Sequence, residues 1–319
     1  MGPKMIDELI RNRTACQMRI RNEARWIRRS LERTFQIASR VAIFDDGSTD
    51  TTLHEAVAAV EPDEHNVIGD DSRRGVVIFR SRDGQRELHW IDSPFANDAV
   101  RPTERANEIR DRGNLWWYLK SNLPFEHVLC LDGDEWLSEE AIRTWPKVAA
   151  AMDAGADFVQ LPFVYLWDGD DQQRIDGIYG PEVDGDGGCL TCRAFHCASP
   201  RHKRLRFPRA FSVQRLTPEE LYNTRVEWNG TRSGLHCGSI PRSGFLPGGR
   251  EPVTAFAEAP VIHAGYRDEA ERQRKFEWYN KHDPPGTESN RFEGGYRHVI
   301  GQPDQHAPGP VKIAPWEDK

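Results

Sequence analysis

Short apolar runs alternate with amphipathic helical segments through the first half of this chain, and this alternation constrains the fold more than any other feature. The runs that read as buried strands are TACQMRI (14–20), VAIF (41–44), VVIF (76–79), VLCL (128–131) and DFVQLPFVYLW (157–167). Helical spacing falls between them, from Glu23 to Phe35 and in TTLHEAVAAV (51–60), whose apolar residues recur at i, i+3, i+4 and i+7. After VLCL, Ser138 is the expected N-cap of a further helix, and Glu139 and Glu140 suit its first turn. The alternation predicts an α/β fold, a central and mostly parallel sheet with helices on both faces.

Two acidic clusters directly follow strands of the expected sheet. Asp45 and Asp46 open DDGSTD after VAIF, and Asp132, Asp134 and Glu135 lie in DGDE after VLCL. Either cluster alone is as easily a polar turn, but such sheets bind ligands beyond the carboxyl ends of their strands, where both clusters fall. Crowded carboxylates repel one another unless a cation lies between them. The two clusters together therefore predict a cation site at that edge of the sheet.

The chain also carries, in order, RIRNEARWIRRSLE (19–32), VAIFDDGSTDTT (41–52), VLCLDGDEWL (128–137) and VIHAGYRDEAERQRKFEWYNKHDP (261–284). Together these segments resemble family-2 glycosyltransferases with the GT-A fold, a Rossmann-like nucleotide-sugar-binding fold, whereas residues 166–250 match poorly. The resemblance implies a hexosyl- or pentosyltransferase that moves a sugar from a nucleotide-sugar donor, with a UDP-sugar favoured, to a hydroxyl acceptor. A divalent cation, Mn²⁺ or Mg²⁺, would neutralise the departing diphosphate, and carboxylate oxygens suit such a cation.

The resemblance assigns roles to both acidic clusters. Asp132, the first aspartate of the D-x-D motif, matches the residue that faces the ribose of the donor. Asp134, the last aspartate, matches the metal ligand, with Glu135 beside it as support. Asp45 matches the position that hydrogen-bonds the nucleobase edge, and Asp46 is its neighbour.

Two further elements complete the expected donor and metal site. Arg21 and Glu23 follow the first strand and match a K-N-E element that lines the nucleotide pocket, with an arginine where lysine is common, which alters the contact geometry. A late histidine often adds a metal ligand in this fold, and His263 in VIHAGY is the first candidate, before His236 in GLHCGS. The alternatives are a solvated helix-start arginine and hydrogen-bonded structural histidines.

We expect an inverting transfer, which needs a general base within hydrogen-bond reach of the acceptor hydroxyl. The candidates for this base lie in the poorly matched middle and are Asp168, Asp170, Asp171 and Glu227. Glu227 follows the D-x-D motif at a distance similar to the family's usual base position, and Asp168 follows a strand at the same edge of the sheet. Both are catalytic candidates, whereas a retaining mechanism would need neither.

A basic stretch gives a hint about the acceptor. From Gly187 to Pro218 the chain has no acidic residue and seven Lys or Arg, although its net charge is −7. The segment 201–215 favours an anionic acceptor, such as a glycan or a phospholipid-linked glycan, and an ordinary surface strand pair is the alternative. A nucleic acid is a second reading, as for phage-type enzymes that glycosylate modified bases of DNA. A non-catalytic nucleotide- or glycan-binding protein that retains the fold is a third.

Composition narrows the remaining choices. No apolar run approaches the ~18 residues of a membrane span, the start shows no secretory pattern, and six cysteines are too few for a disulfide scaffold, so we expect a cytoplasmic protein. The segment CLTCRAFHC (189–197) lacks the second C-x-x-C of a zinc site, and no glycine-rich phosphate loop follows a strand. We divide the chain into a nucleotide-sugar-binding half (1–165), an acceptor-binding half of the same domain with the C-terminal helix (166–285) and a polar, Pro-rich tail (286–319).

Overall fold

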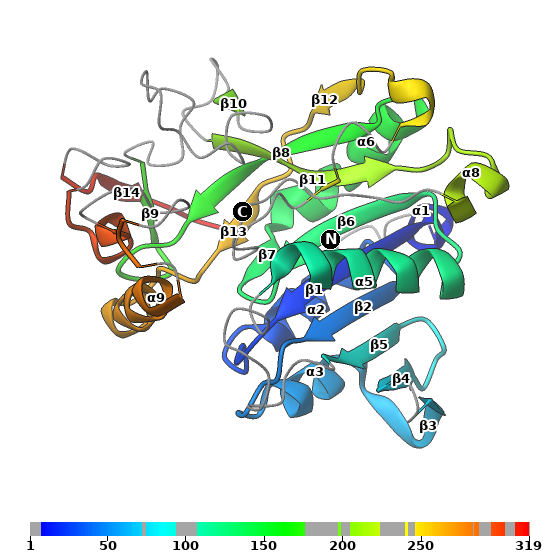
Figure 1. The fold of residues 1–319 in the computed structure, drawn as a ribbon, viewed down its shortest axis with the longest axis horizontal. Coiled ribbons are helices and arrows are strands. Elements are labelled where there is room, and N and C mark those ends of the chain that lie inside the picture. Colours follow the sequence, from blue (N-terminus) through cyan, green and yellow to red (C-terminus); the bar gives the residue numbers. More distant parts are fainter. Residues whose placement is uncertain are drawn as a thin grey trace.

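A computed structural model describes residues 8–71, 75–93, 107–175, 197–198, 205–223, 240–241, 246–282, 284–286, 295–303 and 310–318. Within these ranges a twelve-stranded sheet forms the centre of the molecule, and helices cover both of its faces (Figure 1). The predicted fold class, a central and mostly parallel sheet flanked by helices, is confirmed.

The strands of this sheet are β1 (Thr14–Ile20), β2 (Arg40–Asp45), β3 (Pro62–Asp71), β4 (Val76–Ser81), β5 (Glu87–Asp92), β6 (His127–Asp132), β7 (Glu135–Leu137), β8 (Phe158–Tyr165), β10 (Cys197–Ala198), β11 (Leu205–Ser212), β12 (Thr254–Phe256) and β13 (Val261–His263). Their order is β3-β4-β5-β2-β1-β6-β11-β8-β13-β7, with β10 beside β11 and β12 beside β8. A separate pair consists of β9 (Gln172–Arg174) and β14 (Ile313–Pro315). Strands β5, β2, β1 and β6 run parallel, so their carboxyl ends share one edge.

Strand β5, the neighbour of β2 on the side away from β1, is not one that the sequence predicted. The run VVIF lies in β4, which pairs antiparallel with β5, and β5 is the parallel neighbour of β2. Strand β5 (ELHWID) reads as half polar because it contains His89, yet His89 is buried. Its ring nitrogens lie 2.6 Å from the Tyr118 hydroxyl and 2.8 Å from a Glu87 carboxylate oxygen. Local hydrogen bonds therefore let a polar side chain occupy a buried strand.

Two apolar clusters, one on each face of the sheet, hold the helices. Helices α2 (Ile27–Thr34), α3 (Thr52–Val60) and α6 (Glu139–Asp153) pack on one face, and α5 (Glu108–Asn122) packs on the other. Alternate residues of β1 point to opposite faces, since Cys16 belongs to the first cluster and Ala15 to the second. Burial on both faces explains why the central strands are continuously apolar. The predicted N-cap of α6 is confirmed, because Ser138 Oγ accepts a hydrogen bond from the Ala141 N–H (3.0 Å).

The other helices lie around the ends of the sheet. They are α1 (Glu8–Arg13), α8 (Pro218–Asn223) and α9 (Glu269–His282), with 3₁₀ turns at Pro247–Gly249 and Arg297–Ile300. Helix α9 follows β13 closely and lies beside the end of that strand (Figure 1). Among the helices that the structure describes, none has the length and apolar character needed to cross a bilayer.

The C-terminal residues lie against the body of the domain. Strand β14 pairs with β9, and Trp316 packs against a buried cluster that includes Trp26 and Trp136. The Asp318 carboxylate accepts a hydrogen bond from the Glu139 N–H at the start of α6 (2.9 Å). This end of the chain therefore connects β9 to α6 across the surface.

Candidate active site

Both acidic clusters and the segment 21–23 lie at the same edge of the sheet. In the parallel register Ile20 is opposite Asp45, and Arg19 is opposite Asp132. The ends of β1, β2 and β6 are therefore level, and the residues that follow them converge. The structure thus brings together the predicted nucleotide-binding and metal-binding segments of the first half of the chain.

Close packing explains the glycine of the D-G-D motif. A Cβ atom at Gly133 would lie 2.6 Å from Glu23 Cγ and 2.9 Å from Ile20 Cγ2, closer than real Cβ contacts allow. Any side chain there would push the turn after β6 away from the end of β1. The same packing puts Glu23 near Asp134, and burial followed by the charge of Asp134 raises the pKa of Glu23 well above its ordinary value.

Asp132, Asp134 and Glu135, here called the carboxyl-end cluster, each pair with a cation from a different element. These pairs are Asp132 with Arg112 of α5 (2.8 Å), Asp134 with Lys275 of α9 (2.5 Å) and Glu135 with Arg209 of β11. The cluster therefore joins the central strand β6 to three elements that are distant in sequence. These cations balance the negative charge of the cluster within the protein, and they reduce the repulsion expected between its three carboxylates.

The three carboxylates differ in exposure. The side chain of Asp132 is 37% exposed, whereas those of Asp134 and Glu135 are 6% and 1% exposed. Burial disfavours the charged form of all three, yet the nearby cations lower the pKa of both aspartates below the ordinary value. Burial raises the pKa of Glu135 above its ordinary value, and the charge of Arg209 opposes this effect. Asp132 is therefore the member that a ligand reaches first.

Asp46 ties the end of β2 to its neighbours. It is fully buried, and Arg19 Nη2 donates to its Oδ2 (2.9 Å) while Arg19 Nε donates to Asp111 of α5 (2.8 Å). Burial raises the pKa of Asp46 to about 6, with Arg19 and then Arg21 acting against it. Burial disfavours a charged Arg19, but Glu108, Asp111 and Asp46 raise its pKa. The predicted donor residues Asp46 and Arg21 therefore belong to one charge network beside the cluster.

Asp45 closes the turn after β2. Its Oδ1 accepts hydrogen bonds from the backbone N–H (3.0 Å) and the hydroxyl (2.6 Å) of Ser48. Burial raises the pKa of Asp45, and the two Ser48 hydrogen bonds oppose that effect. The turn is linked to the end of β1, since Thr49 N–H donates to Asn22 Oδ1 (2.7 Å). This arrangement holds Asp45 rigidly at the edge where the nucleobase contact is predicted.

His263, the first candidate for the late metal-binding histidine, lies beside Asp134. Its Nε2 is 3.8 Å from Asp134 Oδ2, and its Nδ1 accepts a hydrogen bond from the Gly265 N–H (3.2 Å). The ring lies between aromatic neighbours, with centroids 4.9 Å from Tyr266 and 5.1 Å from Tyr165. Burial lowers the pKa of His263 to about 4, although Asp134 favours the charged form. In a neutral ring whose Nδ1 accepts the Gly265 hydrogen bond, the proton lies on Nε2 and faces Asp134, so Nε2 could bind a metal ion only after it loses this proton.

The donor set suits a hard divalent cation. Asp132 and Asp134 offer carboxylate oxygens and His263 offers a ring nitrogen, a combination that fits Mn²⁺ or Mg²⁺. The ammonium of Lys275 already lies on Asp134, so a positive charge is stabilised at this position. A Cβ atom at Gly265 would lie 2.1 Å from Asp134 Oδ2 and 2.0 Å from Lys275 Nζ. The chain thus has a glycine at the point where a side chain would fill the space for a cation.

A further acidic cluster, distinct from the two at the carboxyl ends of the strands, lies at the amino end of β6. Glu126, His127 and Asp153, here called the amino-end cluster, place one ligand atom each within 4.8 Å of one another. Arg13 Nη2 lies 2.6 Å from both carboxylates, which are 45% and 42% exposed. Gln214 Nε2 donates to Asp153 Oδ1 (2.5 Å) and lies 3.2 Å from His127 Nε2. The guanidinium of Arg13 therefore takes the position between the carboxylates that a metal ion would need.

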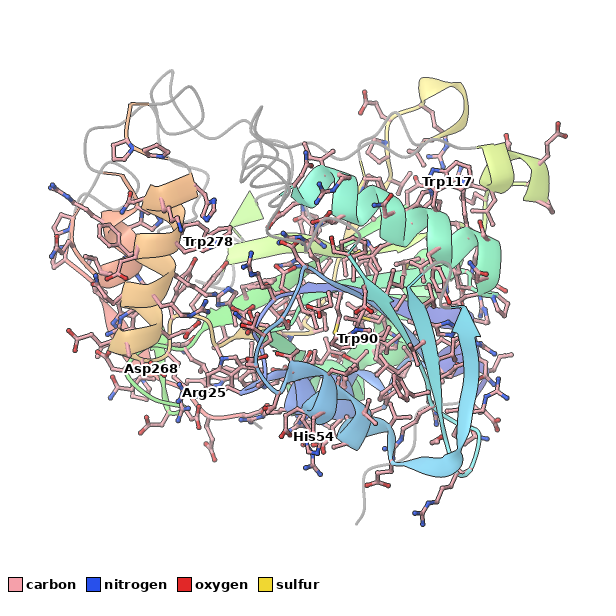
Figure 2. The ribbon with its side chains drawn as sticks, turned by 60° about the horizontal axis from the view of Figure 1, so that its bottom comes forward. Arg25, His54, Trp90, Trp117, Asp268 and Trp278 are labelled. Atoms are coloured by element: carbon pink, nitrogen blue, oxygen red, sulfur yellow. The ribbon has the colours of Figure 1, made fainter. Side chains whose placement is uncertain are left out.

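The remaining predicted residues are not all within the described parts of the chain. Asp168 adopts a left-handed backbone (φ 59°), and Arg272 of α9 donates to its Oδ1 (2.8 Å). Arg25 and Asp268, which form an ion pair, tie the start of α9 to the segment before α2 (Figure 2). Glu227 and His236 lie outside the described residues, so their roles stay predictions.

The described part of the basic stretch 201–215 serves the fold. Arg209 pairs with the buried Glu135, and Arg215 donates to the Gly155 carbonyl (3.0 Å) and lies 3.8 Å from Asp157. Residues 201–204 and the side chains of 205–208 lie outside the description. The charge of Arg209 is therefore used inside the protein, and an anionic acceptor would have to depend on the other basic residues of the stretch.

Sequence reasoning missed the cations of the site. Arg112, Arg209 and Lys275 come from three elements, and no local pattern distinguishes them from the other basic residues of the chain. The available signal was the crowding of DGDE itself, because carboxylates at a buried strand end require cations nearby. Position gave a partial hint, since Arg209 lies in the acid-free stretch and Lys275 lies in the closing segment 261–284.

Comparisons with known proteins found similarity to solved structures only. No protein-family model matches the chain, and no curated protein matches it. One similar solved structure is S. aureus TarS, with 11% identity and a TM-score of 0.40 over 86% of this chain and 40% of that one. Another is a mycobacterial protein, with 15% identity and a TM-score of 0.35 over 85% of this chain and 75% of that one. A third is glucosyl-3-phosphoglycerate synthase from Mycobacterium tuberculosis with phosphoglyceric acid (15%, 0.27, 48% and 43%). The chain spans 40% of the TarS structure, and at these TM-scores the proposals must rest on its own residues.

Proposed function

We propose that this chain is a metal-dependent glycosyltransferase that moves a sugar from a nucleotide sugar, with a UDP-sugar favoured, to a hydroxyl acceptor with inversion. The supporting observation is the carboxyl-end cluster, which ends β6 at the edge where Asp45 ends β2. Each carboxylate of the cluster has its own cation, and two of the three are almost fully buried. Buried ion pairs contribute little to net stability, which favours a functional reason for collecting them here.

Each residue of the cluster then has a distinct task. A divalent cation held by Asp134, Asp132 and His263 would supply Lewis-acid stabilisation of the leaving diphosphate. Arg112 fixes the orientation of Asp132, whose exposed carboxylate is open to a ribose hydroxyl. Glu135 Oε2 accepts a hydrogen bond from the Asp132 N–H (3.0 Å) and so holds the turn in shape. Such second contacts maintain the direction of the groups that touch the ligand.

Asp168 and Glu227 both stay candidates for the general base. Asp168 carries an ion pair with Arg272, and its side chain is 51% exposed. The guanidinium of Arg272 occupies a carboxylate oxygen of Asp168, so Asp168 would have to turn away from Arg272 before this oxygen takes a proton from an acceptor hydroxyl. Glu227 is the alternative, and its distance in sequence from the D-x-D motif supports it. Replacement of each by its amide distinguishes them, because only the base variant loses transfer while it retains donor binding.

The acceptor remains an anionic glycan or phospholipid-linked glycan in this proposal. Its support is the basic segment 201–215, of which Arg209 and Arg215 have partners inside the domain. Arg201, Lys203, Arg204 and Arg206 are the Lys and Arg residues that the acceptor hypothesis now depends on. With a DNA acceptor, the acceptor affinity should decrease steeply as the salt concentration rises. An acceptor affinity that does not change with salt would exclude DNA.

A thermal-shift panel tests the proposal. Nucleoside diphosphates and nucleotide sugars are added with Mn²⁺ or with EDTA, and stability rises by RT ln(1 + [L]/Kd) for a ligand that binds the folded protein. We expect one nucleotide class to raise the melting temperature only with Mn²⁺, and we expect slow hydrolysis of the matching nucleotide sugar. Equal shifts in EDTA would refute the metal-dependent site. Binding without any hydrolysis or transfer would favour the non-catalytic alternative.

A further inference from the structure

Asp134, the residue assigned to the metal, already holds a cation from the protein. Lys275 Nζ donates to Asp134 Oδ2 at 2.5 Å, and the two side chains are 14% and 6% exposed. His263 Nε2 faces the same oxygen at 3.8 Å. A metal ion bound by both Asp134 and His263 would therefore use the oxygen that Lys275 occupies.

Lys275 and such an ion cannot share this oxygen. Metal–oxygen distances are ~2.1 Å for Mg²⁺ and similar cations, so an ammonium 2.5 Å from the same oxygen would lie within about 5 Å of a doubly charged ion. The repulsion between these charges exceeds thermal energy several-fold even at the effective dielectric constant of a protein interior. One of the two cations must leave, or an anion must come between them.

The surroundings allow the lysine side chain to leave while its helix stays in place. Helix α9 is fixed one turn before Lys275, where Arg272 donates to Asp168 and to the carbonyl of Tyr266. The lysine stem is flexible and is not held in a planar fork as arginine is. The 37% exposure of Asp132 marks the open side of the cluster. A diphosphate bound to a cation on that side would present its anionic oxygens to Lys275.

We infer that Lys275 is a displaceable counter-cation of Asp134, which excludes a divalent cation until the diphosphate of the donor takes the ammonium as its own ligand. This inference rests on the proposed function for the identity of the diphosphate. It makes metal and donor binding cooperative, because each removes the obstacle to the other. By thermodynamic reciprocity, the factor by which the diphosphate strengthens metal binding equals the factor by which metal strengthens diphosphate binding.

Mn²⁺ titration with and without UDP tests the inference. Free Mn²⁺ is followed by its electron paramagnetic resonance signal for the wild type, for Lys275→Met, which keeps the stem and removes the charge, and for Lys281→Met, a control at the exposed end of the same helix. We expect Lys275→Met to bind Mn²⁺ alone about tenfold more tightly, because the competing charge is gone. UDP should strengthen Mn²⁺ binding strongly in the wild type and in Lys281→Met, and only weakly in Lys275→Met.

Further variants keep the test decisive. Lys275→Arg retains the charge and should bind Mn²⁺ no more tightly than the wild type, whereas Lys275→Gln should resemble Lys275→Met. The neutral variants should melt at a lower temperature without metal, and Mn²⁺ should restore more of their stability than it does for the wild type. Equal or weaker Mn²⁺ binding by folded Lys275→Met and Lys275→Gln would overturn the inference. The Mn²⁺-only titration decides this point even if no nucleotide binds, in which case the proposed function fails separately.

Discussion

The two ends of β6 carry similar side chains in different settings. Each end combines carboxylates with a histidine, as the amino-end cluster and the carboxyl-end cluster with His263. At the amino end one guanidinium, that of Arg13, contacts both carboxylates, which are close to half exposed. At the carboxyl end three carboxylates take three cations from α5, β11 and α9, and two of these carboxylates are buried.

Burial is what distinguishes a binding site from a surface ion-pair cluster at these two ends. Exposed pairs such as those of Arg13 contribute about 0–1 kcal/mol, and they cost little to form. Buried pairs require desolvation of both charges, and the loss of either partner leaves a buried charge alone. Convergence of cations from several elements on buried carboxylates therefore points to function more strongly than the number of carboxylates does.

The largest expected effect is on activity. Asp134→Asn keeps the size of the side chain but removes the charge that would hold the metal, so transfer or donor hydrolysis should fall by ~100-fold or more. Asp153→Asn at the amino end should leave the activity within a factor of about two, since surface changes away from a site have small effects. Steady-state rates at limiting Mn²⁺ provide the measurement. A fully active Asp134→Asn enzyme would remove this aspartate from the metal site.

The second comparison concerns stability. Arg209→Met leaves Glu135 buried without its cation and should lower the free energy of unfolding by about 3 kcal/mol, whereas Arg13→Met should cost about 1 kcal/mol or less. The exposures of the two arginines, 8% and 24%, justify the contrast. Urea unfolding at pH 7 measures both changes.

A third variant separates the ion pair from packing. Glu135→Gln in the Arg209→Met background removes the unpaired carboxylate and should restore part of the lost stability, because a neutral amide is cheaper to bury. No recovery in the double variant would attribute the loss to the packing of Arg209 over the Phe163 ring, which lies 4.7 Å from the guanidinium.

Local patterns in the sequence predicted the elements and the position of the site. Strand β1 has the predicted bounds, the cap of α6 is Ser138, and the D-G-D motif lies at the expected edge. These features depend on neighbouring residues, which periodicity and turn chemistry describe well. The helix expected from residue 23 begins later, at Ile27, because residues 21–23 take part in the turn contacts of the site.

Long-range pairs account for what the sequence could not predict. Lys275 is 141 residues from Asp134, and Arg209 is 74 residues from Glu135. Any basic residue could serve such a carboxylate as far as a sequence pattern shows, and only the fold selects one. The same reason explains why the basic stretch read as a surface for the acceptor, although Arg209 is buried. Strand β5 was missed because hydrogen bonds between His89 and its neighbours Tyr118 and Glu87 let this polar side chain occupy a buried position.

The smallest expected effect is a difference in pH dependence between the two histidines of these clusters. Burial lowers the pKa of His263 to about 4 and also lowers that of His127. Both rings are neutral in the folded protein at a pH where the unfolded chain, with a His pKa of about 6.5, binds protons. Each ring therefore contributes stability above pH ~6.5, and the contribution is lost as the pH falls toward the folded pKa.

We expect His263→Gln to flatten this loss between pH ~6.5 and ~4 more than His127→Gln does, because burial lowers the pKa of His263 to about 4, whereas the partly exposed Asp153 and Glu126 oppose the lowering at His127. Unfolding free energies in EDTA give the measurement, taken as differences from the wild type. Differences are needed because another group changes stability in the same pH range. Burial raises the pKa of Asp46 to about 6, so ionisation of Asp46 lowers the free energy of unfolding as the pH rises toward that value. Parallel curves for the wild type and His263→Gln would mean that His263 is already charged beside Asp134, and the two ends of β6 would then not differ in this respect.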